Sequence, residues 1–593
     1  MSDPSIDLLR FVQRSPLFKA FGEAELGAML GDSAILQLDS GALLYDQESP
    51  PENLNLVLSG RLRAEHYVGG EVEVRREIGR GEAVGGISIL AGRPHKARVR
   101  AIRDTTVLQV PATAFETLFD AQPAQGRGVV HRWLNRFFES SAEQQVRLSL
   151  GSTRSIAVVA GHAGAPVEAV ARGLGRALAE FNLSLRLDAQ RVDQQRGDHS
   201  SHAAFNSEAG MQLSHWLNEQ ERRYRYLLLQ SDELDSPWTE RCLRQADRIV
   251  MVVDAQQAIR PNAMTRSLLA RAEQADVELA VIGKLPGRAR GWCDLAGTQI
   301  HHCLFSSSHR EFQRLARMLS GRAIGVALGG GGARGFAHLG LFKAMQELQL
   351  EPDIIFGTSM GAFIGGLFAT GMDFADAKVA AEEAWVKRKL LNDYTVPRVS
   401  LIRARKARRH MEQLFGSTLI EDLSCHYACM TTNLSRGRPQ VHDHGRLAHW
   451  IGASMSVPGI APPVIYKGDL LVDGGLLSPV PTQAIADLGR GPVIASDVSS
   501  DEIFRGIHEF GDEPVQAPPA RRASQDLNIF QILYRTATLS TPEEFRQRLA
   551  RADCYLRMPV DGVGMYDWSQ CERLIQAGHQ HARQQLEQWL ASR

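Results

Sequence analysis

The spacing of hydrophobic and polar positions changes along this chain of 593 residues, and each change predicts a different kind of domain. Between residues 35 and 110, short alternating runs such as NLNLVLSGRLRAEHYV are separated by Gly and Pro, which predicts a small β-roll or barrel. Residues 112–150 repeat apolar positions at helical spacing. From about residue 153, apolar runs such as SIAVVAG and ADRIVMVVDA alternate with helical stretches, which predicts a parallel α/β domain to about residue 320.

A second α/β pattern begins at AIGVAL and continues through DIIFG and VIASDV. Residues 501–525 are polar and contain Pro, which predicts a mobile loop. The last part, from about residue 528, has a helical pattern with a short strand at CYLRMPV. These patterns divide the chain into a β-roll domain (1–120), a helical linker (121–152), an α/β domain (153–320), a second α/β domain with a parallel central sheet (321–500), and a mobile loop with the C-terminal helical part of that domain (501–593).

Composition and charge exclude several classes of function. Basic and acidic residues balance at 67 each, so no overall charge attracts nucleic acid, and we expect no nucleic-acid partner. No apolar run reaches the roughly 18 residues of a membrane span, and the first residues do not resemble a signal peptide. Seven scattered cysteines favour a reducing compartment, so we expect a cytoplasmic protein. The pair Cys425 and Cys429 has neither zinc-site nor haem-site spacing, and we expect no metal and no cofactor.

Three motifs that follow apolar runs carry the candidate chemistry. GTSMG places Ser359 between Gly357 and Gly361 after a predicted strand and before a predicted helix, which is the pattern of a nucleophile elbow. Alone the pattern is weak, because Gly-rich turns are common after strands in α/β domains. The other two motifs are the glycine-rich loop Gly330, Gly331, Gly332, Ala333, Arg334, Gly335 and the turn Asp473, Gly474, Gly475.

Each of these two motifs has a structural alternative. The glycine-rich loop is either a phosphate-binding loop or an oxyanion hole, whose backbone N–H groups approach a tetrahedral intermediate without obstruction by side chains. A dinucleotide-binding loop requires an acidic residue at a strand end about 20 residues later, whereas this loop is followed there by GTSMG. The Asp473 turn is either an ordinary turn or the site of a general base, because a serine nucleophile needs one and a desolvated carboxylate gains proton affinity.

Taken together, residues 323–500 resemble the patatin-like phospholipase family, including the segment ASMSVPGIAPPV (453–464) before the aspartate turn. The resemblance implies a Ser–Asp dyad without a catalytic histidine, in which Ser359 attacks the ester and Asp473 takes its proton. It also implies that residues 330–335 hold the oxyanion. Arg334 matches the basic position of that loop, where it has either a catalytic or a packing role. Gly452 stands where relatives often carry Arg.

The rest of the chain is similar to other domains of one family. The first 120 residues resemble a cyclic-nucleotide-binding domain, and residues 230–252 resemble the degenerate Rossmann- or P-loop-like middle domain of neuropathy target esterase and its bacterial relatives. The resemblance implies a lysophospholipase acting on glycerophospholipid esters. Cyclic-nucleotide binding is disfavoured, because Gly86 replaces a ribose-binding Glu and His95 replaces a phosphate-binding Arg. Lys96 or Arg98 are the candidates to replace that Arg. Nucleotide hydrolysis is also disfavoured, because residues 161–165 lack the GK[ST] of a P-loop.

Two groups of cations bear on membrane contact. They either form solvated helix surfaces or contact lipid phosphates at the inner face of the membrane, at up to about 1 kcal/mol per cation. The first comprises Arg403, Arg405, Lys406, Arg408 and Arg409, and the second Lys387, Arg388 and Lys389. Three functions therefore remain: a phospholipase or lysophospholipase, a general carboxylesterase or triacylglycerol lipase, and a regulatory scaffold whose hydrolase domain is secondary. Substrate panels distinguish the first two, and cyclic-nucleotide binding by residues 1–150 would favour the third.

Overall fold

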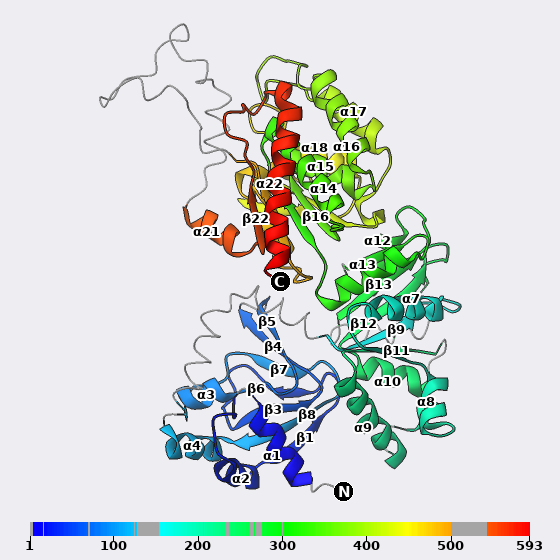
Figure 1. Ribbon diagram of the computed structural model, residues 1–593, viewed down its shortest axis with the longest axis vertical. Helices are drawn as coiled ribbons and strands as arrows, with labels where there is room; N and C mark the ends of the chain where they lie inside the picture. Colours follow the sequence, from blue (N-terminus) through cyan, green and yellow to red (C-terminus); the bar gives the residue numbers. More distant parts are fainter. Residues whose placement is uncertain are drawn as a thin grey trace. The chain divides into compact units, whose positions relative to one another are not determined.

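A computed structural model gives the fold of the chain (Figure 1). It describes residues 4–15, 17–68, 71–123, 125–126, 153–204, 207–232, 236–260, 266, 276–298, 300–499 and 542–593. Most of the predicted linker and all of the predicted mobile loop at 501–525 lie outside these residues. The described chain forms two compact units: an N-terminal unit (1–285 and 291–321) and a C-terminal unit (286–290 and 322–593).

The N-terminal unit begins with two antiparallel four-stranded sheets, which form the predicted β-roll. Their orders are β1-β8-β3-β6 and β2-β7-β4-β5. Alternation along β7 buries every second side chain, as the period of two requires. The elements are α1 (Pro4–Arg14), α2 (Glu23–Gly31), β1 (Ala34–Leu38), β2 (Leu43–Tyr45), β3 (Asn53–Ser59), β4 (Leu62–Val68), β5 (Glu71–Ile78), β6 (Ala83–Val84), α3 (Gly86–Ala91), β7 (Arg98–Ala101), β8 (Thr105–Pro111) and α4 (Ala112–Ala121).

The second half of this unit is a six-stranded parallel sheet in the order β10-β11-β9-β12-β13-β14. Every residue of β9 is buried, which explains its continuous apolar run. The elements are β9 (Ser155–Ala160), α7 (Val167–Ala179), β10 (Ser184–Leu187), α8 (Ala189–Arg196), α9 (Glu208–Arg223), β11 (Tyr226–Gln230), α10 (Pro237–Gln245), β12 (Arg248–Asp254), β13 (Asp276–Ile282), α12 (Arg288–Ala296), β14 (His301–Leu304) and α13 (His309–Ser320).

Buried ion pairs join the β-roll to the parallel sheet. The guanidinium group of Arg103 lies 2.6 Å from Glu221 Oε1 and 2.9 Å from Asp247 Oδ1. Arg61 Nε lies 3.1 Å from the same Asp247 oxygen. Burial alone would disfavour the Asp247 charge, but the two guanidinium groups hold the pKa of Asp247 below its usual range. Removing one partner from such a cluster leaves an uncompensated buried charge, so the cluster is a point where the unit is sensitive to substitution.

The C-terminal unit is built on one mixed sheet with parallel strands at its centre. The order is β19-β20-β17-β16-β15-β21-β22, with β18 paired to β17. Strands β17, β16, β15, β21 and β22 run parallel, whereas β18 and β20 are antiparallel to β17. The strands are β15 (Gly325–Leu328), β16 (Ile354–Thr358), β17 (His426–Asn433), β18 (Arg438–His442), β19 (Val464–Tyr466), β20 (Asp469–Asp473), β21 (Val493–Asp497) and β22 (Cys554–Arg557).

Helices cover this sheet, and two of them, α14 and α22, approach each other closely at glycines. A Cβ on Gly340 of α14 would lie 2.3 Å from the Ile575 carbonyl oxygen, and one on Gly578 of α22 would lie 2.5 Å from that of Ala337. Figure 1 shows α22 running along the unit in front of the sheet. The helices are α14 (Ala337–Glu347), α15 (Met360–Ala369), α16 (Phe374–Ala381), α17 (Arg405–Phe415), α18 (Leu447–Ser454), α19 (Thr482–Ala486), α21 (Pro542–Ala550) and α22 (Cys571–Ala591).

The predicted fold class is confirmed: a β-roll, a parallel α/β sheet and a second α/β domain with a parallel centre follow one another in the order expected.

Candidate active site

Ser359 stands at the sharp turn between β16 and α15. Its backbone has φ 53° and ψ −120°, which a residue with a side chain adopts only at a cost in energy. The flanking glycines permit the turn, because a Cβ on Gly357 would lie 2.4 Å from the carbonyl oxygen of Gly361. The half-buried Ser359 side chain is therefore held at the start of α15, where the helix N-terminus favours developing negative charge.

The pairing of three strands brings Asp473 beside this turn. Thr358 pairs with Met430 of β17, and the next residue of β17, Thr431, pairs with Asp473 at the end of β20. The nucleophile turn and the aspartate turn therefore lie at the same edge of the sheet, although they are more than 100 residues apart in the sequence.

The Asp473 carboxyl is buried, with 1% of the residue exposed. Its Oδ1 accepts a hydrogen bond from the N–H of Gly475 at 2.7 Å, while Oδ2 is buried and has no partner within 3.5 Å in the described chain. Burial raises the pKa of Asp473 to about 6, and the nearby Ser359 hydroxyl and the Gly475 N–H limit that rise. Oδ2 is therefore available to take a proton, and such contacts are often long in a free enzyme and shorten when substrate binds.

The segment 453–464 supports both residues. The N–H of Ser359 donates to Ser454 Oγ at 2.9 Å, and the N–H of Asp473 donates to the carbonyl of Ser456 at 2.9 Å. Ser454 is fully buried, so without its hydroxyl the N–H of Ser359 would lack an acceptor.

The glycine-rich loop lies against Ser359. A Cβ on Gly330 would lie 3.2 Å from the Ser359 Cβ, and one on Gly335 would lie 2.2 Å from the Met360 Cγ. Gly332 has φ +59°, and a Cβ there would lie 2.3 Å from the carbonyl oxygen of Met565, so only glycine fits.

The backbone N–H groups of this loop divide into two sets. Gly330, Ala333 and Arg334 donate to carbonyl oxygens of the protein at 3.0, 2.7 and 3.3 Å. The N–H groups of Gly331 and Gly332 have no acceptor among the described residues. These two are therefore the loop donors available to a ligand.

The Arg334 side chain ties the loop to the C-terminal segment. Its Nε donates to the Val563 carbonyl at 2.7 Å. This contact supports the packing role, the second of the two interpretations of Arg334.

His338 lies behind the loop, with both ring nitrogens engaged. Nε2 lies 2.9 Å from the Gly329 carbonyl oxygen, and Nδ1 lies 2.8 Å from Ser496 Oγ. Burial lowers the pKa of His338 to about 4, so the ring is neutral at pH 7. A neutral ring that donates to the Gly329 carbonyl holds the loop in place and has no hydrogen bond to Ser359.

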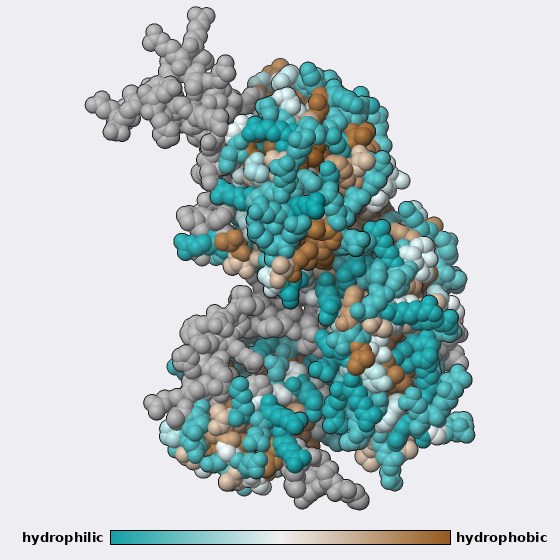
Figure 2. Space-filling model, in the orientation of Figure 1, coloured by the Kyte–Doolittle hydropathy of each residue, from teal (hydrophilic) through white to brown (hydrophobic). Residues whose placement is uncertain are grey.

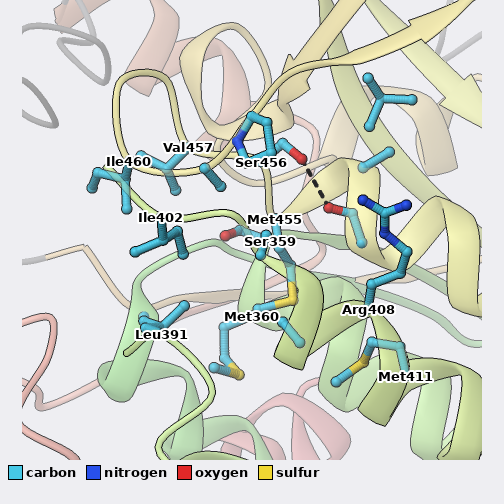
Figure 3. Close-up of a pocket in the computed structure, with 18 of the residues that line it drawn as sticks. Ser359, Met360, Leu391, Ile402, Arg408, Met411, Met455, Ser456, Val457 and Ile460 are labelled. Atoms are coloured by element: carbon cyan, nitrogen blue, oxygen red, sulfur yellow. Dashed lines mark hydrogen bonds between the residues drawn. The ribbon is translucent and has the colours of Figure 1, made fainter. Parts of the chain in front are cut away.

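A cavity of about 360 Å³ opens onto Ser359 (Figure 3). Its wall is largely apolar, which suits a hydrocarbon chain better than a charged ligand. Trp385 and Trp568, which stack at 5.3 Å, close one part of it. The other apolar residues include Leu391, Ile402, Met411, Met455, Val457 and Ile460.

Sequence analysis did not identify several residues of this site. Ser454, His338, Tyr566 and the apolar wall carry no local motif that points to a site. Tyr566 lines the cavity, and its pKa is raised by burial and then by the Asp473 charge, which places the ring near the carboxyl. Only the position of Ser454 within the segment 453–464 carried a signal.

Three family models match successive parts of the chain. They are the cyclic nucleotide-binding domain over residues 35–122, the neuropathy target esterase family P-loop like domain over 152–293, and the patatin-like phospholipase over 326–486. The matches give the order of a cyclic nucleotide-binding domain, a P-loop like domain of the neuropathy target esterase family and a patatin-like phospholipase domain.

Curated relatives align along nearly all of this chain. Patatin-like phospholipase domain-containing protein 7 of Mus musculus is 29% identical over 623 residues, which cover 94% of this chain and 45% of the relative. Lysophospholipase nte1 of Neosartorya fischeri is 28% identical over 651 residues, which cover 93% of this chain and 42% of the relative. The chain thus spans less than half the length of these relatives.

In the two nucleotide-binding-like domains, residues at the expected ligand positions contact the protein itself. Arg98, one candidate for a cyclic phosphate, lies 2.8 Å from Asp46, and the His95 ring stacks on Tyr45 at 3.7 Å. In the P-loop-like domain, His162 Nε2 accepts from the N–H of Asp254 at 2.9 Å. These contacts agree with the expectation that neither cassette binds its usual nucleotide, which stays a prediction.

Within the described part of the chain, every helix is too short or too polar to cross a membrane.

Proposed function

We propose that this protein is a lysophospholipase that uses Ser359 as nucleophile and Asp473 as its only side-chain base. The observation that carries the proposal is the buried Asp473 carboxyl, with a free Oδ2, beside a strained serine at one end of an apolar cavity. A relative is named lysophospholipase, and the apolar wall suits a fatty-acyl chain.

In the proposed reaction, Ser359 Oγ attacks the ester carbonyl while its proton passes to Asp473. The N–H groups of Gly331 and Gly332 stabilise the oxyanion, at about 10²–10³ in rate per donor. The carbon–oxygen bond to glycerol then breaks, and Asp473 gives its proton to the leaving oxygen. Water hydrolyses the acyl-enzyme by the same steps and releases the fatty acid.

Fatty-acid release from a lysophospholipid by wild type, Ser359→Ala and Asp473→Asn tests this proposal. We expect both variants to lose nearly all activity while their circular dichroism stays that of wild type. Retained activity in Ser359→Ala would refute the nucleophile. A folded wild type that hydrolyses simple esters but no lysophospholipid would favour the carboxylesterase alternative, and one inert on every ester would favour the scaffold alternative.

We also propose peripheral membrane contact through the hairpin formed by residues 393–403. Tyr394 bridges to Ile402, and the N–H of Arg403 donates to the carbonyl of Asp393 at 2.9 Å, so the hairpin is ordered. The hairpin nevertheless exposes large apolar side chains: Tyr394, Val396 and Val399 are 70%, 75% and 68% exposed. Exposed cations, Arg398 and Arg403, flank them.

The combination of apolar residues and cations suits an anionic bilayer, whose phosphates the cations contact while the apolar side chains enter the interface. Figure 2 shows a largely hydrophilic surface with separate hydrophobic patches on the C-terminal unit. Co-sedimentation with vesicles of phosphatidylcholine with and without 30% phosphatidylserine tests the contact. We expect Val396→Asp to weaken binding severalfold and Val379→Asp, at a 61% exposed position on α16, to leave it unchanged. Equal binding by both variants would contradict the proposal.

A further inference from the structure

The cavity at Ser359 has two chemically different sides. Figure 3 shows Leu391, Ile402 and Val457 on one side of Ser359 and Arg408, from helix α17, on the other. The first side offers only hydrocarbon to a ligand. The second side offers a guanidinium group. The other four cations of the same cluster do not line the cavity: Arg403, Arg405, Lys406 and Arg409.

Arg408 is a cation with no partner among the residues that the structure describes. It is exposed, and in the described chain it forms neither an ion pair nor a hydrogen bond through its side chain. By contrast, Lys387 and Arg388 both pair with Glu383, at 3.6 and 2.9 Å. A guanidinium with five unused donors at the mouth of a cavity is suited to a planar or tetrahedral oxyanion.

His449, from α18, also lines the cavity. Its pKa is lowered by burial and by the Arg408 charge, so the imidazole is neutral at pH 7 and carries one N–H donor. In the described chain this side chain has no hydrogen bond, and its ring contacts Trp450. Gly452, one turn further along α18, lines the same cavity, and a Cβ there would meet nothing within 4 Å. The cavity is therefore open beside these two donors.

We propose that Arg408, with His449 as a second donor, binds the phosphate of the lysophospholipid while its acyl chain lies along the apolar side. Arg408 thereby selects phosphate-bearing esters over neutral glycerol esters. The three carbons of glycerol join the phosphate to the ester, so the phosphate must lie close to Ser359 when the carbonyl does. This inference rests on the proposed function at Ser359, and it assigns the substrate class of that site.

Two soluble substrates that differ only in the phosphate test the selection. They are a short-chain lysophosphatidylcholine and the 1-monoacylglycerol with the same acyl chain, both used below their critical micelle concentrations so that no lipid surface contributes. The variants are Arg408→Gln and the matched control Arg409→Gln, which changes the neighbouring exposed arginine that does not line the cavity.

We expect Arg408→Gln to raise the KM for the lysophospholipid about tenfold with little change in kcat, the size of one charge-assisted hydrogen bond. The KM and kcat of Arg408→Gln for monoacylglycerol should stay unchanged. The KM and kcat of Arg409→Gln should stay unchanged for both substrates. Gly452→Arg in the Arg408→Gln background returns a cation to the same cavity. If this double variant recovers part of the lost preference for the lysophospholipid, the charge of Arg408 and not its packing sets that preference.

Equal losses on both substrates, or no loss on either, would overturn the proposal. A loss seen only with substrate embedded in vesicles would also overturn it, because Arg408 would then bind membrane phosphate. Calorimetric binding of the short-chain lysophospholipid to Ser359→Ala protein gives a readout that needs no turnover. If wild type proves inert, a tenfold weaker binding by the Ser359→Ala, Arg408→Gln double variant still supports the phosphate site, whereas unchanged binding refutes it.

Discussion

Replacing Asp473 by Asn should abolish activity and yet stabilise the C-terminal unit at neutral pH. The carboxyl is buried, and its pKa is about 6, whereas an aspartate in an unfolded chain has a pKa of about 3.9. The folded state therefore holds the proton more tightly than the unfolded state. As pH rises from about 4 to about 6, the unfolded chain gains a solvated charge while the folded chain must accept a buried one, and stability is lost.

The size of the effect follows from the difference of about two pKa units, at 1.36 kcal/mol per unit. The charge costs the wild-type fold about 3 kcal/mol at pH 8 and about half of that at pH 5, where most folded molecules are protonated. Asn is neutral at both values, and its amide oxygen can keep the hydrogen bond from Gly475. The stability gain of the variant should therefore be larger at pH 8 than at pH 5 by about 1.4 kcal/mol.

Scanning calorimetry of both proteins at pH 5 and pH 8 measures this difference. For a unit of this size, 1.4 kcal/mol corresponds to roughly 3–6 °C in Tm. In parallel, kcat/KM of wild type should rise about tenfold per pH unit below about pH 6 and level off above it, because the deprotonated carboxylate is the active form. The activity of Asp473→Asn should be lower by about 10²–10⁴.

A Tm difference that is the same at both pH values would refute the reasoning, because it would show that no buried charge is being removed. A wild-type rate without a titration between pH 5 and pH 7 would refute the assignment of Asp473 as the base, even if the stability result held.

Three further substitutions test other parts of the structure. Gly332→Ala should reduce kcat by more than about 10²-fold, because it displaces a proposed oxyanion donor. The control is Gly371→Ala: Gly371 also has a positive φ, but a Cβ there would meet nothing within 4 Å, so this variant should keep its activity in the same assay. Asp247→Asn should destabilise the N-terminal unit by about 3–5 kcal/mol in urea titrations, whereas Asp46→Asn, in an exposed pair, should cost less than about 1 kcal/mol. Ser454→Ala should lower kcat about tenfold without raising KM, because the nucleophile's N–H loses its acceptor; an unchanged kcat would contradict this.

Ser359 and Asp473 could be singled out because their signals are local, and their roles as nucleophile and base stay predictions. The turn at Ser359 needs glycine on both sides for reasons set within five residues, and Asp473 is followed by two glycines in the same way. The fold class was likewise predictable, since strands of the β-roll such as β7 alternate with period two and the buried parallel strands are continuous apolar runs.

The rest of the site depends on contacts between distant segments. The sequence could not predict which N–H groups of the loop remain available to a ligand. Ala333 and Gly330 donate to the carbonyls of Met565 and Pro479, which lie far along the chain. Arg408 appeared in the sequence as one of five clustered cations, and only the packing of α17 beside α18 separates it from the others.

The dependence of the glycine loop on residues 563–565 also sets an order of events during synthesis. Ala333 and Arg334 find their partners in Met565 and Val563, which emerge roughly 230 residues later. At roughly 5–20 residues per second, a ribosome needs about 10–50 s to reach them. The serine turn can form long before that, but the loop that would hold its oxyanion cannot close. Until this part of the C-terminal unit has been made, Ser359 therefore lacks a closed glycine loop beside it, and the proposed hydrolysis cannot begin.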